Sequence, residues 1–378
     1  QRQMCIRDRA YINHYVGQAY FSRAYAYFEL ALHYCKNYDP ASAGSDYGIP
    51  LVTEYAPSSD YSKYPGRSSL KETFDFIVKD LEQASNLVGI QGEAQSAYIT
   101  LDVVEALKAR VYLEMEDYQN AAAAAQGLIN SKRYTLISDG DAYKKMWLND
   151  VGTEAIWQFA MSKTETGSNA LGSSFMGIVD KLPRPSYLPV KSVLNLYDKE
   201  NDIRYDAYFT TGLIDRQVGD DIEVTYCSKW PGNPELYEGK SNNVNKLKAF
   251  RISEMYLIAA EAYAMLNQED KASEMLNELK KIRIKGWTET VYNGAALMQE
   301  IQDERVRELF AEGNRLFDMK RWKIGMKRSS SDAQRDDYLP VLGTDIEKEA
   351  TDNRWVWPIP KDEMDSNPQL KGQQNPGY

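Results

Sequence analysis

The chain has 378 residues, of which 45 are Lys or Arg and 55 are Asp or Glu, so its formal charge at pH 7 is −10. This acidic balance argues against a nucleic-acid partner, which needs a basic face for phosphates. An apolar content of 43% excludes global disorder, and no run of about 18 uncharged apolar residues could span a membrane as a helix. With two histidines and no CxxC pair, we expect neither a metal nor a cofactor.

Helical patterns dominate the first 161 residues. Apolar residues recur there at the spacing of a helix face. Ser68 or Ser69 can cap the second helix, because Glu72 places a negative charge in its first turn. A segment rich in Gly, Pro, Ser and Tyr, 39–67, predicts a long loop before that helix. The predicted helices are 15–34, 68–87, 100–115 and 118–130.

The composition changes at residue 162. From 162 to 248 Gly, Pro, Asn, Ser and Asp are frequent, so we expect a loop-rich insertion that carries ligand-binding surface. Helical spacing then returns, and prolines in the tail after Arg354 keep it extended or turned. We expect Trp357, in this tail, to be largely buried against the helices. The later predicted helices are 250–266, 271–284, 294–312 and 314–324.

One pattern of small and large residues occurs three times. Small residues let two helices approach closely, and large ones fill the space between them, as in tetratricopeptide-like helix pairs. The copies are Ala24-x-Ala26-Tyr27-Phe28-x-Leu30, Ala109-x-Val111-Tyr112-Leu113-x-Met115 and Ala260-x-Ala262-Tyr263-Ala264-x-Leu266.

The unequal spacing of these copies favours scattered helix pairs over a regular solenoid. We therefore predict a mainly all-α protein of tetratricopeptide-like pairs with a loop-rich insertion. The segments 100–130 and 250–284 should each form an antiparallel pair. One compact domain is expected, with a helical-repeat part (10–161), an insertion (162–248), and C-terminal helix pairs with an extended tail (249–378).

Four glutamates share one face of the predicted 294–312 helix. Two carboxyl groups about 5–10 Å apart would suit glycoside hydrolysis. The alternative is a solvated or ion-paired face, and we favour it because catalytic carboxylates usually lie in the loops of a cleft. The chain also has no GxSxG, GxxxxGK[ST] or HExxH motif, so we expect no enzyme activity. The glutamates are Glu300, Glu304, Glu308 and Glu312, and the expected partners are Arg305, Arg307 and Arg315.

Aromatic residues of the loops are the candidates for ligand binding. Trp230 precedes Pro231 and Gly232, so a turn determines the position of its ring. A flat apolar ring suits stacking on a sugar, and the alternative is a ring that clamps the loop to the helical body. Trp230 is the first candidate for a ligand-binding residue, and the others are Tyr226, Tyr237, Tyr187, Tyr61 and Tyr64.

Several blocks together resemble one family. The segment 251–262 fits its Arg-x-x-Glu-x-Tyr-Leu-x-x-Ala-Glu-Ala helix, and Tyr47-Gly48-Ile49-Pro50-Leu51 resembles the turn with Tyr-Gly and a following Pro that comes after its first repeat helix. The other blocks are 17–28, Glu304-Arg305, Glu308-Leu309, Glu312-Gly313, Arg315, 318–322, Trp357-Pro358-Ile359-Pro360, Glu363, Asn367-Pro368 and 374–378. In this combination the chain resembles the SusD/RagB family of outer-membrane nutrient-binding lipoproteins.

The resemblance implies a protein on the surface of the outer membrane. Such a protein captures glycans, or sometimes peptides, without catalysis, and it caps a SusC-like TonB-dependent transporter. The resemblance further implies that the family's signal peptide, lipid-bearing cysteine and first helices are missing from this sequence. The string Met4 to Arg9 resembles translated adapter sequence, so we expect residues 1–9 to be a non-native leader.

The shared blocks also suggest which residues hold the fold. Glu304, Arg305, Trp322 and Trp357 lie in blocks common to family members with unlike ligands, so we expect them to support structure. Two alternatives remain open for the function. One is a glycoside hydrolase with paired carboxylates, and the other is a helical-repeat scaffold that binds protein partners and no glycan.

Overall fold

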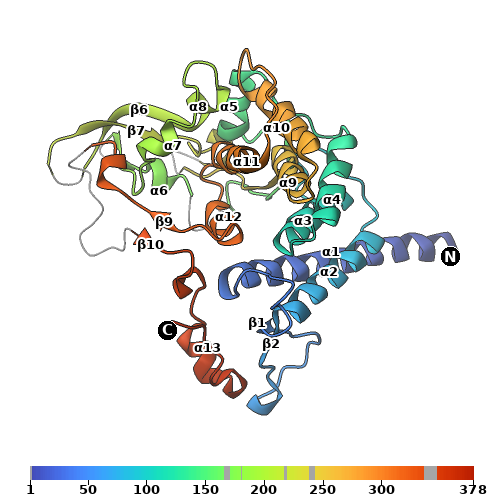
Figure 1. Ribbon diagram of the computed structural model, residues 1–378. Coiled ribbons are helices and arrows are strands. Elements are labelled where there is room, and N and C mark those ends of the chain that lie inside the picture. The colour runs from blue at the N-terminus through green and yellow to red at the C-terminus, as the bar shows by residue number, and fades with distance from the viewer. Residues whose placement is uncertain (1, 166–170, 180, 217–218, 238–242, 336–346) are drawn as a thin grey trace.

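The computed structural model describes residues 2–165, 171–179, 181–216, 219–237, 243–335 and 347–378 (Figure 1). Long helices form its main layer. They are α1 (Arg2–Tyr34), α2 (Leu70–Leu87), α3 (Leu101–Glu114), α4 (Tyr118–Asn130), α9 (Ile252–Met265), α10 (Glu269–Arg283) and α11 (Gly294–Glu308). The shorter helices are α5 (Gly140–Leu148), α6 (Ser173–Met176), α7 (Lys191–Leu194), α8 (Ile203–Tyr208), α12 (Arg315–Arg321) and α13 (Lys361–Ser366).

The long helices pack in sequence as a row of pairs. Helix α1 packs on α2, α3 on α4, α4 on α9, and α9 on α10. Three-residue connections join α3 to α4 and α9 to α10, so each pair is antiparallel. The structure thereby confirms the predicted helices of 15–34, 100–130 and 250–284, and with them the mainly helical fold.

The repeated alanines lie where the helices meet. Ala24, Ala109 and Ala260 are completely buried, as are Ala121 of α4 and Ala272 of α10. Larger side chains around them belong to one apolar core that runs through all the pairs. The prediction that small residues allow close helix contacts is therefore confirmed.

Local capping explains where two of these helices begin. Ser69 accepts a hydrogen bond from the backbone N–H of Glu72, and the Glu72 carboxylate accepts one from the N–H of Ser69, which completes a capping box. Thr100 caps α3 by accepting from the N–H of Val103. Both starts agree with the predicted ones to within two residues.

Short antiparallel strand pairs connect the helices, and each sheet has two strands. The strands are β1 (Tyr47–Pro50) with β2 (Arg67–Ser69), β3 (Ala155–Gln158) with β8 (Lys248–Arg251), β4 (Ile178–Val179) with β5 (Leu182–Pro183), β6 (Phe209–Ile214) with β7 (Ile222–Cys227), and β9 (Met326–Lys327) with β10 (Glu347–Lys348). Single 3-10 turns complete the fold: η1 (Tyr61–Lys63), η2 (Pro234–Leu236), η3 (Ser330–Asp332), η4 (Asn353–Trp355) and η5 (Pro368–Leu370).

The insertion is more regular than the sequence analysis predicted. Its β6–β7 ribbon pairs Thr211 with Thr225 and Ile214 with Ile222 in unbroken register. The alternation of apolar and polar residues over 222–226 is the strand signal that the loop-like composition obscured. The predicted helix at 250 also begins later, because 248–251 pairs with β3 as strand β8.

Glycine at position 48 permits a close backbone approach between β1 and the start of α2. A Cβ atom at Gly48 would lie closer than 3.0 Å to Thr73 and Ser69, whereas one at Gly44 would meet no atom within 4 Å. Gly48→Ala should therefore lower the free energy of unfolding by about 1–3 kcal/mol, and Gly44→Ala should change it by less than about 0.5 kcal/mol. Urea unfolding of both variants tests this, and equal losses would contradict the close approach.

Arg67 holds the C-terminal tail against the helical layer. Its guanidinium donates to the side-chain oxygen of Asn375, to the carbonyl of Gln373 and to the carbonyl of Tyr34 at the end of α1. In Figure 1 the tail runs from β10 past α13 to the C-terminus, below the main helical layer. As predicted, the tail is mostly extended or turned.

Candidate functional site

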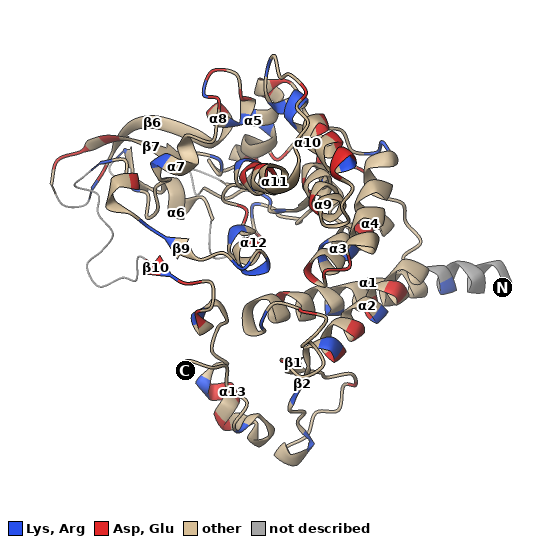
Figure 2. Cartoon of the chain, viewed as in Figure 1, with Lys and Arg blue, Asp and Glu red and all other residues tan. Residues whose placement is uncertain are grey.

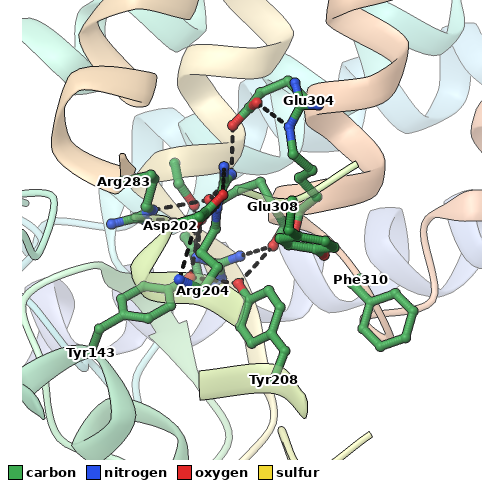
Figure 3. Close-up of polar contacts among 12 residues, drawn as sticks. Tyr143, Asp202, Arg204, Tyr208, Arg283, Glu304, Glu308 and Phe310 are labelled. Atoms are coloured by element: carbon green, nitrogen blue, oxygen red, sulfur yellow. Dashed lines mark hydrogen bonds and ion pairs between the residues drawn. The ribbon is translucent and has the colours of Figure 1, made fainter. Parts of the chain in front are cut away.

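Two glutamates of α11 lie at the centre of a buried ion network. Glu308 is completely buried and accepts hydrogen bonds from Arg204, Arg251 and Arg283, at 2.9–3.0 Å (Figure 3). These arginines come from α8, β8 and α10, which are far apart in the sequence. In Figure 2 α10 and α11 carry residues of both charges, and these two helices pack on each other.

Glu304 lies one turn before Glu308 in the same network. Its carboxylate binds Arg204 and Arg307, with Arg307 Nε at 2.7 Å. Burial would raise the pKa of Glu304, but the two guanidinium groups outweigh burial and lower it to about 2. The pKa of Glu308 is likewise held well below its usual value of 4.5, since Arg283 and Arg251 outweigh the effect of burial.

The surroundings of these glutamates do not suit a glycosidase pair, because each carboxylate is buried and already bound by two or three guanidinium groups. A general acid for glycoside hydrolysis needs a raised pKa, and both carboxylates have lowered ones. The favoured interpretation, ion pairing, is confirmed for this face, and its two central glutamates, Glu304 and Glu308, are completely buried. Three arginines are expected from the sequence to pair with these glutamates. Arg307 does so by binding Glu300, whereas Arg305 pairs with Asp318 of α12.

The lowered carboxylate pKa values predict a loss of stability in acid. A carboxylate whose pKa is lower in the folded state than in the unfolded state contributes its full stabilisation above the unfolded pKa. For Glu304 the unfolded pKa is 4.5 and the folded pKa about 2. Its contribution is therefore lost as the pH falls from 4.5 toward about 2. The free energy of unfolding in urea should therefore be lower at about pH 3 than at pH 7. Glu304→Gln should show a smaller difference between the two pH values. Equal wild-type stability at both would contradict the prediction.

The buried ion network joins the insertion, residues 162–248, to the helical body. Arg204 reaches α11 from the insertion, and Lys229, also from the insertion, donates to Glu312 at 2.7 Å. Burial lowers the pKa of the Lys229 ammonium to about 8, although Glu312 opposes this effect. Lys248, at the edge of the insertion, pairs with Asp150 at 2.9 Å. The loops that follow α5 therefore rest on a rigid support.

Trp230 belongs to this support and does not face solvent. Its side chain is only 3% exposed, and its ring meets the ring of Trp147 edge-on at 5.1 Å. The indole N–H donates to the carbonyl of Ala311 at 3.1 Å. The expectation of an open stacking ring is therefore wrong, and the alternative of a loop clamp fits the structure. Composition could not reveal this, because burial of the loop depends on Trp147, which is distant in sequence.

The other five candidate residues are not brought together. Tyr226 is buried in the small core of the β6–β7 ribbon, and Tyr237 is half-buried after η2. Tyr187 is 66% exposed between β5 and α7, with its ring 6.4 Å from that of Phe175. Tyr61 and Tyr64 form an edge-on ring pair between β1 and β2, away from the insertion (Figure 1).

Trp357 is more exposed than the sequence analysis predicted. Its side chain is 46% exposed, so the expectation of a largely buried ring is wrong. One side of the ring contacts His33 with ring centroids 4.4 Å apart, and the backbone N–H of Trp357 donates to the carbonyl of His33. The ring also meets that of Tyr34 edge-on at 6.0 Å, so the end of α1 covers part of it.

A cleft of about 350 Å³ opens between α1 and α12. Residues of α3, of α9 and of the insertion also line it. The volume lies within the range of small-ligand pockets, about 300–1,000 Å³. Among the residues that line it are Tyr25, Phe28, His33, Arg110, Glu254 and Phe317.

Comparison with known proteins identifies the family. The SusD family model matches residues 223–378, and a model described as "Starch-binding associating with outer membrane" matches residues 7–113. A SusD superfamily protein from Bacteroides thetaiotaomicron superimposes with a TM-score of 0.79 and 26% identity, over 98% of this chain and 79% of that one. The chain belongs to the SusD/RagB family.

Individual members of the SusD/RagB family are similar over most of this chain. SusD-like protein P38 of Formosa agariphila is 25% identical over 407 residues, which cover 96% of this chain and 74% of that protein. A putative sugar binding protein from Bacteroides vulgatus gives a TM-score of 0.76 at 25% identity, over 98% of this chain and 79% of that one. The two family models leave out residues 114–222, which include much of the insertion.

The residues of the SusD/RagB blocks are largely those of the buried ion pairs. Arg251 binds Glu308 and Glu312, Arg305 binds Asp318, and the Trp322 indole donates to Glu261. The expectation that Glu304 and Arg305 hold the fold agrees with their burial. Sequence reasoning missed Arg204 and Arg283, which occur outside the quoted blocks and give no local signal.

Two further features concern membranes and metals. Within the described residues, none of the helices combines the length and the apolar character needed to cross a bilayer. The same residues contain no group of three or more His, Cys, Asp or Glu side chains placed to hold a metal ion.

Proposed function

We propose that this SusD/RagB protein captures oligosaccharides, or other nutrients, at the surface of the outer membrane and delivers them to a SusC-like TonB-dependent transporter. In this proposal it acts without catalysis and is tethered through an N-terminal lipid anchor. Support comes from the matched model described as starch-binding and outer-membrane associated, and from the similar B. vulgatus structure described as a putative sugar binding protein.

One structural observation carries the proposal: an exposed aromatic ring, that of Tyr187, stands on an insertion that a buried ion network holds in place. Tyr187, the most exposed of the candidate residues, follows β5 in the insertion, and Arg204 and Lys229 join that insertion to α11. A receptor without catalysis needs flat apolar faces on a rigid body. The proposed ligand contacts are Tyr187, Tyr237, Tyr61 and Tyr64, with Trp230 and Tyr226 beneath the surface.

The test is an array of neutral and acidic oligosaccharides, with reducing-sugar release measured on every bound compound. Binding without release supports the proposal, and release would favour the hydrolase alternative. No binding, together with co-purification with a transporter, would favour the scaffold. On a bound glycan, Tyr187→Ala should weaken affinity at least about fivefold, judged from the stacking energy of flat rings, whereas Tyr98→Ala, which removes an exposed ring outside the insertion, should not.

A further inference from the structure

The outer face of α1 carries no charged residue over five turns. Every residue from Tyr11 to Leu30 is described, and none of the exposed ones among them is Asp, Glu, Lys or Arg. A surface helix usually carries charged residues on its outer face, and 26% of this whole chain is charged. The exposed residues are Tyr11, Ile12, Asn13, Tyr15, Val16, Ala19, Ser22, Ala26 and Leu30.

These residues, apart from Asn13, form one stripe along the helix. At 3.6 residues per turn they fall within less than half of the helix circumference, on the side opposite Phe21, which is completely buried. The charged residues beside the stripe are engaged elsewhere. Arg23 pairs with Asp80 of α2 at 2.6 Å, and Glu29 lines the cleft between α1 and α12. The uncharged stripe is therefore a helix face with no partner among the described residues.

Small residues form the middle of the uncharged stripe, and large ones form its two ends. Ala19, Ser22 and Ala26 allow another helix to approach closely, as the completely buried Ala24 and Ala260 do inside the row of pairs. The stripe is about 30 Å long, which is the length of a second helix of about 20 residues. The large side chains are Tyr11, Ile12, Tyr15 and Val16 at one end, 41–64% exposed, and Leu30 at the other, 45% exposed.

The charge of the protein favours a second copy of the same chain as the partner of this stripe. Two copies with a formal charge of −10 each repel one another over most of their surfaces. An uncharged helix face is where that repulsion is weakest. A strongly charged partner, by contrast, would find no opposite charge there to pair with.

The order of residues along the stripe favours an antiparallel pair. With the two helices centred near Ser22, Ala19 of one copy faces Ala26 of the other, and Tyr15 faces Leu30. Space is available for this arrangement, because Gly17 lies against Val88 at the end of α2, so the earlier turns of α1 extend past α2 (Figure 1). Each extended part then lies along the second half of the other copy's helix.

We infer that the uncharged stripe of α1 is a dimer interface, in which two copies of this chain pair their α1 helices antiparallel about Ser22. The two-fold axis makes this contact self-complementary, so the assembly closes at two copies. One helix from each copy gives an interface at the small end of specific contacts, for which we expect a dissociation constant of about 1–100 μM. Dimerisation of this kind needs no glycan, so it goes beyond the proposed function and is independent of it.

Sedimentation of the 378-residue chain tests the interface. Over about 1–200 μM the mean mass should rise from that of one chain toward that of two. Ala19→Glu and Ala26→Glu each place a charge in the middle of the stripe and should weaken dimerisation about tenfold or more. The matched control is Ala123→Glu, which adds the same charge at an exposed position of α4 and should leave the dimer unchanged. Circular dichroism confirms that each variant is folded.

Cysteine cross-linking tests the direction of the two helices. In a chain that carries Cys5→Ser, the remaining cysteines, Cys35 and Cys227, are buried. Ser22→Cys then places a thiol near the two-fold axis, and mild oxidation should join the two copies. Val16→Cys should not cross-link, because an antiparallel pair separates the two copies of residue 16 by about 20 Å along the helix axis, and a disulfide spans at most about 7 Å between Cα atoms.

Each outcome decides the question. A mass that rises with concentration in the wild type and in Ala123→Glu, but not in the two stripe variants, supports the interface. The mass of one chain at every concentration overturns it, as does a dimer that persists in both stripe variants. Cross-linking of Val16→Cys as efficient as that of Ser22→Cys overturns the antiparallel arrangement. If the glutamate variants do not fold, the two cysteine variants decide whether the stripe is the interface. The proposed function is tested separately by the glycan array, because either result there is compatible with a dimer.

Discussion

Replacing Glu308 by alanine should lower the free energy of unfolding by about 3–5 kcal/mol, the usual cost of removing one partner from a buried ion pair. The carboxylate is completely buried and binds Arg204, Arg251 and Arg283. Without it three guanidinium groups lose an acceptor in a place that water cannot reach. Urea unfolding at pH 7, followed by circular dichroism, measures the loss.

An exposed ion pair provides the control for this variant. Asp75 pairs with Lys71 one turn away on α2, and both side chains are more than half exposed. Water solvates either partner when the other is removed, so Asp75→Ala should cost less than about 0.5 kcal/mol. If the Glu308 and Asp75 variants lost the same stability, the buried network would not support the fold as the structure indicates.

Trp230→Ala should be the second severe substitution, with a loss of about 3–5 kcal/mol, as for other large aromatic residues removed from a core. The ring fills the space beside Trp147, and its N–H satisfies the carbonyl of Ala311. Both contacts disappear in the variant, and the insertion loses its attachment to the end of α11. Thermal and urea unfolding measure the effect.

Trp357→Ala is the matched comparison, because it removes the same side chain from a position that is 46% exposed. Its cost should be only about 1 kcal/mol, since roughly half of the ring already contacts water. A larger loss in Trp357→Ala than in Trp230→Ala would show that Trp357 is the buried ring and Trp230 the open one, as the sequence analysis predicted.

The two tryptophans show why the candidate site could not be predicted from sequence. Trp230 lies in a stretch rich in Gly, Pro and Asn, which is typical of exposed loops, yet it packs against α5 and against Phe310 and Ala311, which follow α11. Trp357 lies in a block shared by the SusD/RagB family, which suggested a buried structural role, yet the residue is 46% exposed. Exposure of a side chain depends on the segments that pack on it, and neither local composition nor local pattern contains that information.

Sequence alone determined the helix pairs, the capping of α2 and the small residues between the helices. These features depend on periodicity and on groups a few residues apart, such as Ser69 and Glu72, so they can be read locally. Only the tertiary structure decided which arginines neutralise Glu304 and Glu308, which tryptophan is exposed and where a cleft opens. Arg204 and Glu308 are 104 residues apart, and their pairing arises because burial of charge requires a partner from whichever element the fold brings near.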